Sequence, residues 1–314
     1  MRTFAAALVA PALASFVPAQ DPANELPKDE APAPEVIRYD LARPKRAFDL
    51  PPELREVSAV TAVDEHTVAC VQDELGILWF VDLREGRVRS TDRFGSKGDY
   101  EGLARDHDGY WVLRSDGLLG RLTPGARGYV LSDAFTVGLQ GSDLEGLCFD
   151  PRTGHLLIAP KDLAKEVQEG FREAGAKRKD AREQRFVFAF DVERRVLLPE
   201  PVVRLTAGRL LDQAAARGEP VPTKPDKKGR PKPDLELRFS AVAVHPETGD
   251  LWLLAVDSHA LVAVDRDGSL RSMHLLDPAD LPQPEGVTFL PNGDLVVTSE
   301  GVEGPGRLRV YGRK

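Results

Sequence analysis

A short pattern recurs five times along this chain, and its spacing constrains the fold more than any other feature. Each copy has a polar residue, a small residue and an apolar residue, followed by a turn and a second apolar run. Three copies open on Glu-Gly and two open on Ser-Ala. The opening residues are Ser58, Glu101, Glu145, Ser240 and Glu285, at successive spacings of 43, 44, 95 and 45 residues.

The repeating unit has the size of one propeller blade. Most copies continue into a third apolar run, and their Gly, Asp and Asn turns between short β-branched runs are hairpin signals. One such unit cannot bury both of its faces, whereas five units in a ring can. The sequence therefore predicts an all-β fold, a five-bladed β-propeller. We expect residues 35–44, "EVIRYDLARP", to supply the missing outer strand of the last blade.

The one long spacing places about 51 additional residues in the third blade. We expect this helical insert within about residues 162–184 and 205–234. Leu163, Val167 and Phe171 recur at helical spacing in its first part, and a second short helix is expected over residues 207–219. Residues 220–234 are basic and Pro-rich, which predicts a mobile loop. Two interpretations remain open: a surface decoration, or a lid or docking element over one propeller face.

The N-terminal region has the features of an export signal. In residues 1–19, Arg2 precedes an apolar run that Pro11 interrupts, and Val17 and Ala19 precede a cleavage site before Gln20. Residues 20–36 form a Pro-rich linker, and the propeller is expected over residues 37–314. The prediction is therefore an exported protein, either periplasmic or secreted, with no membrane span.

Charge and cysteine content exclude further classes. The net charge of −8 argues against a nucleic-acid-binding protein, because phosphate contacts need a basic surface. Two cysteines do not make a disulfide framework, and Cys70 and Cys148 both lie in apolar runs. We interpret them as small core residues.

The opening residues of the copies form a ring in this fold, because the first strand of every blade lines the central channel. Carboxylates that converge on one axis repel one another, so they must take up protons or hold a cation. A ring of oxygen donors suits Ca²⁺, whereas zinc and copper prefer His or Cys ligands. The metal candidates are Glu101, Glu145 and Glu285. Two alternatives stay open: hydrogen bonding between blades, with the Gly serving a bulge, and direct catalysis by a carboxylate.

A second ring is expected where the second strand of each blade ends, beside the start of the first strand. The two rings then form an acidic funnel at one face of the propeller, with Lys161 as its one clear cation. The candidates at this channel mouth are Asp73, Asp116, Lys161, Asp257, His259 and Glu300.

Several blocks resemble the SdiA-regulated (YjiK-like) family. They begin with "ELREVSAVTAVDEHTVACVQDELGILWFVDL" and continue with "DYEGLA", "DLEGLCFDP", "FSAVAVHPETGDLWLLAVDSHALVAVDRDG" and "QPEGVTFLPNGDLVVTSE". The resemblance covers about residues 50–311 without much of the insert. It implies a five-bladed propeller distantly similar to NHL-repeat proteins, and a calcium site on Glu101, Glu145 and Glu285 with Glu56 as a further candidate. Ala59 and Ala241 stand where this family often has Gly. The resemblance implies no reaction.

Two functions from different classes remain. The first is a non-catalytic, calcium-stabilised binding module, a monomer whose propeller face or insert takes a protein, peptide or glycan ligand. The second is a calcium-dependent hydrolase of lactones or phosphoesters, in which the channel ion acts as a Lewis acid near Asp257 and His259. An ion fully surrounded by protein oxygens favours binding, whereas an open coordination position beside a base favours chemistry. The fold by itself does not decide between them.

Overall fold

The computed structural model describes residues 36–171 and 183–314, and within them the strands form five antiparallel blades, four of them with four strands and the third with five. The predicted signal peptide and most of the predicted linker lie outside the described residues. No described helix is both long enough and apolar enough to cross a membrane. Cys70 and Cys148 are both free thiols, the first fully buried and the second partly exposed.

The first two blades follow each other directly along the chain. Blade I has β2 Val57–Asp64, β3 Thr67–Gln72, β4 Leu75–Asp82 and β5 Arg87–Lys97. Blade II has β6 Tyr100–Arg105, β7 Tyr110–Arg114, β8 Leu118–Gly125 and β9 Gly128–Thr136. Each strand pairs with the next, so each blade is a simple meander.

Blades III and IV enclose the insert. Blade III has β10 Asp143–Asp150, β11 His155–Asp162, β12 Gln184–Asp191 and the short β13 Val196–Leu197, while β14 Val203–Thr206 pairs with the other part of β12. Blade IV has β17 Phe239–Val244, β18 Leu251–Ala255, β19 Ala260–Val264 and β20 Leu270–Leu275. A short 3-10 helix, η2 Val256–Ser258, joins β18 to β19.

Blade V closes the ring with strands from both ends of the described chain. It has β21 Gln283–Phe289, β22 Leu295–Glu300 and β23 Arg307–Tyr311, and its outer strand is β1 Arg46–Asp49. The 3-10 helix η1 Pro52–Leu54 leads from β1 into blade I. The expected outer strand was placed too early, because only Tyr39 of the segment 35–44 forms an isolated bridge, to Arg313.

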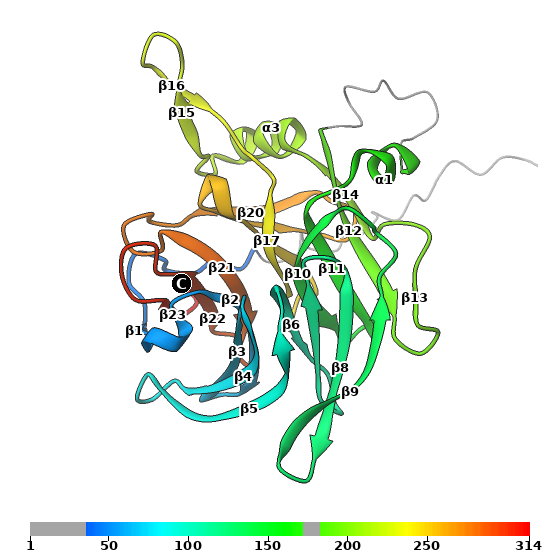
Figure 1. The fold of residues 1–314 in the computed structure, drawn as a ribbon. Helices are drawn as coiled ribbons and strands as arrows, with labels where there is room; N and C mark the ends of the chain where they lie inside the picture. Colours follow the sequence, from blue (N-terminus) through cyan, green and yellow to red (C-terminus); the bar gives the residue numbers. More distant parts are fainter. Residues whose placement is uncertain (1–35, 172–182) are drawn as a thin grey trace, which may run out of the picture. The chain divides into compact units, whose positions relative to one another are not determined.

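The innermost strands form a closed cycle. They contact one another in the order β2, β6, β10, β17 and β21, and β21 contacts β2 again (Figure 1). Apolar side chains fill the space between neighbouring blades, so that each blade face is buried against the next. The five-bladed propeller predicted from the repeat spacing is therefore confirmed.

The insert is only partly helical. The described part of its first segment forms α1 Lys165–Gly170, and Leu163, Val167 and Phe171 pack on the blade III core as their spacing predicts. The second helix is α3 Ala207–Arg217, which the Thr206 side chain caps at its N-terminus and Gly218 ends in the left-handed region. The expected loop over 220–234 instead contains a two-stranded hairpin, β15 Thr223–Pro225 with β16 Pro231–Pro233.

The hairpin forms because Asp226 organises its turn. The Asp226 carboxylate accepts hydrogen bonds from the backbone N–H groups of Lys228 and Arg230 and from the Arg230 guanidinium. Gly229 has a φ of 74°, which favours glycine at that position. Composition alone did not reveal this local network.

Close contact between innermost strands predicts a specific sensitivity in blade II. A Cβ atom on Gly102 would lie 2.6 Å from the Cβ atom of Leu147 and 2.8 Å from the carbonyl oxygen of Glu145. We expect Gly102→Ala to lower the free energy of unfolding by about 1–3 kcal/mol, because backbone must move to accept the methyl group. Chemical denaturation of both proteins measures the change.

Gly208→Ala in α3 is the matched control. No heavy atom lies within 4 Å of the added Cβ there, and alanine favours helix. We expect that variant to be neutral or slightly stabilised. Equal effects of the two substitutions would contradict close packing of β6 against β10.

Candidate functional site

Every ring residue lies at a β-bulge. The strand register skips Ser58, Glu101, Glu145, Ser240 and Glu285, each of which lies between two paired neighbours of its innermost strand. A bulged residue has no partner directly opposite, and its side chain is turned away from the regular alternation. The five ring residues therefore share one structural position, as the repeat alignment predicts.

The two serines of the ring bond to the next blade. Ser58 Oγ donates to the carbonyl oxygen of Tyr100 at 2.6 Å, and Ser240 Oγ donates to that of Pro284 at 2.9 Å. Each acceptor immediately precedes the ring residue of the following blade. The hydrogen-bonding interpretation of the ring thus holds for the serines.

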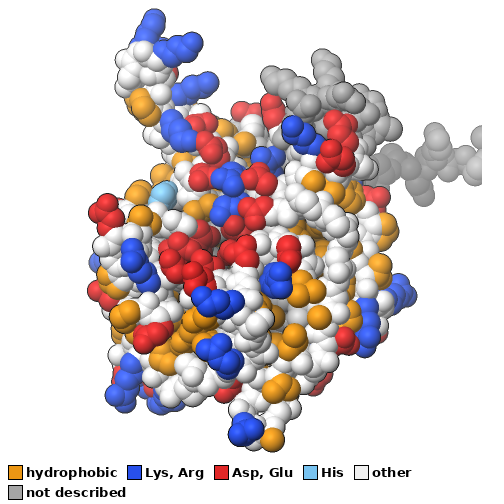
Figure 2. All heavy atoms as spheres, viewed as in Figure 1, with side chains coloured by type: hydrophobic (Ala, Val, Ile, Leu, Met, Phe, Trp, Pro, Cys, Tyr) orange, Lys and Arg blue, Asp and Glu red, His pale blue; other side chains and the backbone are white. Residues whose placement is uncertain are grey.

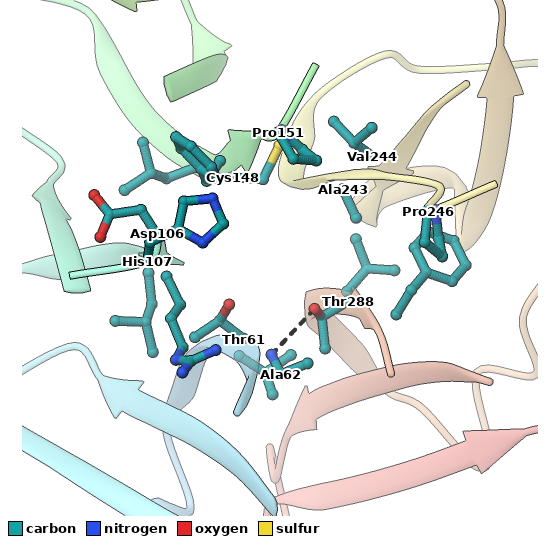
Figure 3. A pocket seen from close by; sticks show the side chains of 17 residues that line it. Thr61, Ala62, Asp106, His107, Cys148, Pro151, Ala243, Val244, Pro246 and Thr288 are labelled. Carbon is teal, nitrogen blue, oxygen red and sulfur yellow. Dashed lines mark hydrogen bonds between the residues drawn. The ribbon is translucent and has the colours of Figure 1, made fainter. Parts of the chain in front are cut away.

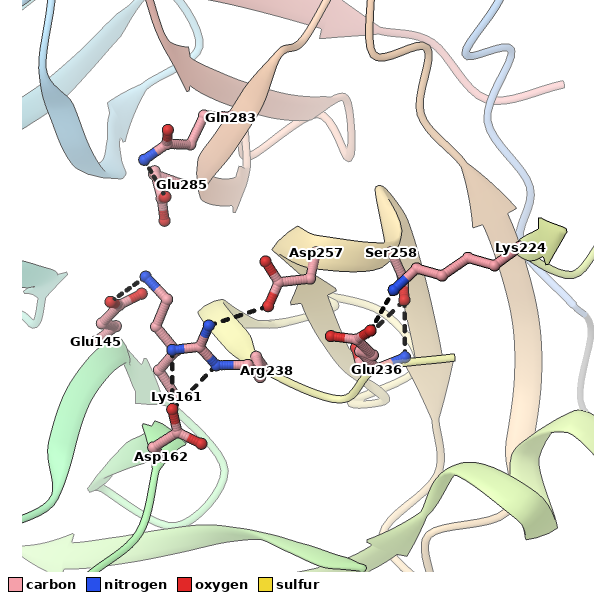
Figure 4. Close-up of polar contacts among 10 residues, drawn as sticks. All are labelled: Glu145, Lys161, Asp162, Lys224, Glu236, Arg238, Asp257, Ser258, Gln283 and Glu285. Carbon is pink, nitrogen blue, oxygen red and sulfur yellow. Dashed lines mark hydrogen bonds and ion pairs between the residues drawn. The ribbon is translucent and has the colours of Figure 1, made fainter. Parts of the chain in front are cut away.

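The glutamates of the ring are in a different situation. Glu145 and Glu285 are only 5% and 4% exposed, so both carboxyl groups are nearly removed from water. Lys161 Nζ donates to Glu145 Oε1 at 2.5 Å, and Gln283 Nε2 donates to Glu285 Oε1 at 3.2 Å (Figure 4). The second oxygen of Glu145, Oε2, is buried without a hydrogen-bond partner among the described residues. A buried carboxylate oxygen without a partner is costly and calls for a proton or a cation.

Burial and mutual repulsion shift the acidity of these groups. Burial, followed by the charges of Glu145, Asp99 and Glu285, raises the pKa of Glu101 to about 9. Burial also raises the pKa of Glu145 and of Glu285, against the opposing charge of Lys161. The three glutamates stand at equivalent bulges of the innermost strands, at one end of the channel, and the charges of Glu145 and Glu285 both act on Glu101.

Lys161 is held in the protonated state by this surrounding charge. Burial by itself would lower the pKa of Lys161, but the charges of Glu145, Glu285 and Asp143 outweigh it and raise the pKa. In Figure 4 the ammonium group points into the space between Glu145 and Glu285. Lys161 therefore already neutralises part of the ring charge.

A second acidic group lies between blades V and I. Burial, with the charges of Asp73 and Glu56, raises the pKa of Glu300 to about 7. Burial and the charge of Glu56 also raise the pKa of Asp73, whose Oδ1 has no partner among the described residues. The structure thus brings Glu56, Asp73 and Glu300 together, and the charge of Lys161 reaches Glu300 as well.

A third ring was missed by the sequence reasoning, which named only one of its members, Glu56. Its members stand two residues before the ring positions: Glu56, Asp99, Asp143, Arg238 and Gln283. The repeat alignment already contained these positions, so reading it two residues further toward the N-terminus finds them. Arg238 corrects the expectation that Lys161 is the one cation, because its guanidinium bonds Asp162 at 2.8 Å and Asp257 at 3.2 Å.

Two of the candidates for the channel mouth already have hydrogen-bond partners. Asp116 bonds the Arg114 guanidinium at 2.6 Å and the backbone N–H of Leu118 within its own turn. His259 has a φ of 44°, and its Nε2 lies 3.0 Å from the carbonyl oxygen of Pro282. A carbonyl oxygen only accepts, so this nitrogen must carry the proton. Both side chains therefore already have partners, and a role for either residue at the channel mouth stays a prediction.

The insert reaches the same face as the funnel. The backbone N–H of Glu236 donates to Ser258 Oγ at 2.8 Å, beside Asp257. Lys224, at the base of the hairpin, bonds the Glu236 carboxylate (Figure 4). Figure 2 shows acidic side chains gathered over the funnel, with the basic tip of the hairpin beyond them. The sequence did not predict this placement.

The residues offer donors for a hard cation without forming a complete set. The described residues contain no group of three or more His, Cys, Asp or Glu side chains arranged to hold a metal ion. The donors are nonetheless all oxygens, carboxylates outnumber the nearby cations, and one buried oxygen of Glu145 has no partner. This donor chemistry fits Ca²⁺ better than a transition metal.

Comparison with known proteins supports the fold, and a family model matches part of the sequence. The model of the SdiA-regulated family matches residues 222–302, which hold the whole of the fourth and fifth blocks. No curated protein matches the chain. The glutaminyl cyclase of Myxococcus xanthus superposes with a TM-score of 0.53 at 14% identity, over 87% of this chain and 96% of that one.

A virginiamycin B lyase from Staphylococcus aureus gives a TM-score of 0.37 at 11% identity, over 86% of this chain and 73% of that one. At 14% identity, the similarity to the glutaminyl cyclase shows the fold alone. The resemblance noted in the sequence is confirmed: this five-bladed propeller carries the pattern of the SdiA-regulated family over residues 222–302.

Proposed function

We propose that the protein is an exported, non-catalytic binding module whose funnel holds a calcium ion at the bulge ring. Its funnel face, with the adjoining insert, would then take a protein, peptide or glycan ligand. The observation that carries the proposal is the ring itself: three converging glutamates, two of them nearly fully buried, with Glu145 Oε2 unpartnered. Export rests on the sequence of residues 1–19.

Glu101, Glu145 and Glu285 are the residues that would hold the ion. When bound, Ca²⁺ supplies two positive charges to a site where Lys161 supplies one. Glu145 is the central ligand of the proposal, since its Oε1 faces Lys161 and its Oε2 is free to bind a cation. Glu56, the further candidate, lies with Asp73 and Glu300 and contributes charge rather than ring geometry.

The alternative of a calcium-dependent hydrolase has less support. It needs a base beside the ion. His259 Nε2 donates to the Pro282 carbonyl group, which leaves Nδ1 as the basic nitrogen, and none of the hydrogen bonds of the described residues joins His259 to a ring glutamate. Asp257 is paired with Arg238. The binding module is therefore the function that the geometry favours.

Calcium should stabilise the protein through Glu145. At about a hundredfold excess over its dissociation constant, a ligand adds about 2.7 kcal/mol to the free energy of unfolding. We expect thermal unfolding of the wild type to shift upward with Ca²⁺ relative to chelator, and Glu145→Gln to lose that shift. Elemental analysis of the purified protein detects an ion that chelator does not remove. Absence of both the shift and the metal contradicts a calcium site.

Lys161→Met distinguishes a ring that binds Ca²⁺ from a ring in which Lys161 is the structural counter-ion. Without Ca²⁺ we expect this variant to lose about 3 kcal/mol, because it leaves Glu145 buried without its partner. If the ring binds Ca²⁺, the ion should restore much of the loss. If Ca²⁺ restores none of it, Lys161 is the structural counter-ion of the ring and the calcium proposal fails.

The stability of the folded protein should depend on pH, because burial and neighbouring charges raise the pKa of the ring carboxyl groups. Glu101 binds its proton more tightly in the folded protein, where its pKa is about 9, than in the unfolded chain near 4.5. The folded state then holds more protons across this interval, so stability falls as pH rises from about 5 to about 9. In chelator, we expect Glu101→Gln to flatten this decline and to unfold several degrees higher than wild type at pH 9.

Glu65→Gln is the matched control for the pH series. Glu65 is exposed in the turn between β2 and β3, at the other end of the blade from the ring. We expect it to follow the wild-type curve at every pH. A Glu101→Gln curve that also follows wild type would show that Glu101 ionises normally in the fold.

A further inference from the structure

The other mouth of the channel carries a separate pocket. It is a cavity of about 260 Å³ that residues from all five innermost strands and their following turns line (Figure 3). These lining residues stand at the far ends of the strands from the bulge ring, so the pocket and the funnel lie at opposite ends of the channel. Nothing in the proposed function uses this pocket.

The body of the pocket is apolar. Leu103, Leu147 and Val287 stand two residues beyond the ring glutamates, and all three are buried. Phe149 and Phe289 lie further toward the mouth, where the His107 ring meets Phe149 edge-on at 6.1 Å. A volume somewhat below the 300 Å³ at which pockets for drug-sized ligands begin indicates a compact ligand with an apolar body.

Arg105 brings the one positive charge to the lining. It ends β6, it is exposed, and its side chain hydrogen-bonds the neutral phenol of Tyr110. None of the ion pairs in the described part of the chain involves Arg105, and its guanidinium has donors to spare for a second acceptor.

The carboxylates at this end are committed elsewhere. Asp106 Oδ2 accepts from Trp111 Nε1 at 2.8 Å and from Arg121 Nη1 at 2.7 Å. In Figure 3 its carboxylate points away from the cavity, toward which His107 turns. Asp150 is fully buried, paired with Arg266 at 2.9 Å. The pocket therefore presents a cation that no neighbouring anion neutralises.

We propose that this pocket binds a small monocarboxylate with an apolar body, a ligand class independent of the calcium proposal. Its carboxylate pairs with Arg105 at the rim, and its body packs on Leu103, Leu147 and Val287. The Thr61 hydroxyl lies on the same lining and offers a further hydrogen bond. A charge-assisted bond to Arg105 gives the acid preference over a neutral molecule of the same shape.

Phenylacetate is the probe, with phenylacetamide as its neutral equivalent and acetate as the acid without an apolar body. Titrations followed in ¹H–¹⁵N spectra of the full folded chain give both the dissociation constants and the place of binding. We expect phenylacetate to bind at millimolar or lower concentration, at least tenfold more tightly than phenylacetamide or acetate. Shifts should fall on residues 61, 105, 147 and 288, and the constants should be the same with calcium and with chelator.

Arg105→Met tests the charge, and Arg127→Met is its control. Arg127 is exposed in the turn between β8 and β9 and does not line the pocket. We expect Arg105→Met to weaken phenylacetate at least tenfold and to leave phenylacetamide unchanged, while Arg127→Met changes neither. Absence of phenylacetate binding, equal binding of the acid and the amide, or shifts confined to the funnel would each overturn the proposal.

Discussion

The bulge at the start of each innermost strand is the constraint on which the site depends. Neighbouring innermost strands approach so closely that Gly102 and Gly286 have backbone or side-chain atoms within 3 Å of where a Cβ atom would be. The side chain of each bulged residue, which stands directly before the Gly or Ala of its copy, is turned out of the regular alternation of the strand. Five blades bring five such side chains to one axis. The polar ring is thus a product of strand geometry. The residue type at each bulge decides what the ring does: serine completes a hydrogen bond between blades, and glutamate leaves a charge.

The negative charge of the funnel is balanced unevenly around the channel. Lys161 approaches Glu145 from the same blade, and Arg238 joins Asp162 to Asp257 across blades III and IV. The side of the funnel formed by blades V and I has Glu56, Asp73 and Glu300, and only the more distant charge of Lys161 offsets their repulsion there. Protons can fill part of this deficit up to about pH 7, the pKa of Glu300, whereas a divalent cation can fill it at higher pH. Proton uptake and cation binding are therefore competing solutions to one electrostatic problem.

The sequence predicted the fold well because the repeat reports strand geometry directly. Spacings near 44 residues identified five blades, and alignment on one position identified the ring. The same alignment held the Asp99 and Arg238 positions, which were missed because only the motif residues were compared. Asp116 bonds its own turn, as turn carboxylates often do, and its place at the channel mouth stays a prediction. The hairpin at 223–233 and the closing strand at 46–49 depend on tertiary pairing, which composition does not report.

The two ends of the channel differ in the partners that their carboxylates find. At the far end, Asp64, Asp106 and Asp150 each accept a backbone N–H of their own turn, and Asp150 also pairs with Arg266 of blade IV, so these carboxylates already have partners. At the funnel end, the charged side chains stand on bulges and strand ends, where Lys161 pairs with Glu145 of its own blade and Arg238 joins Asp162 to Asp257 across two blades. The far mouth is consequently lined mainly by apolar side chains with a few polar ones such as Thr61, and Arg105 carries the one positive charge among its lining residues. The funnel instead accumulates buried carboxyl groups. One fold thereby presents two surfaces of opposite chemical preference, an acidic one for cations and an apolar one with a single positive charge.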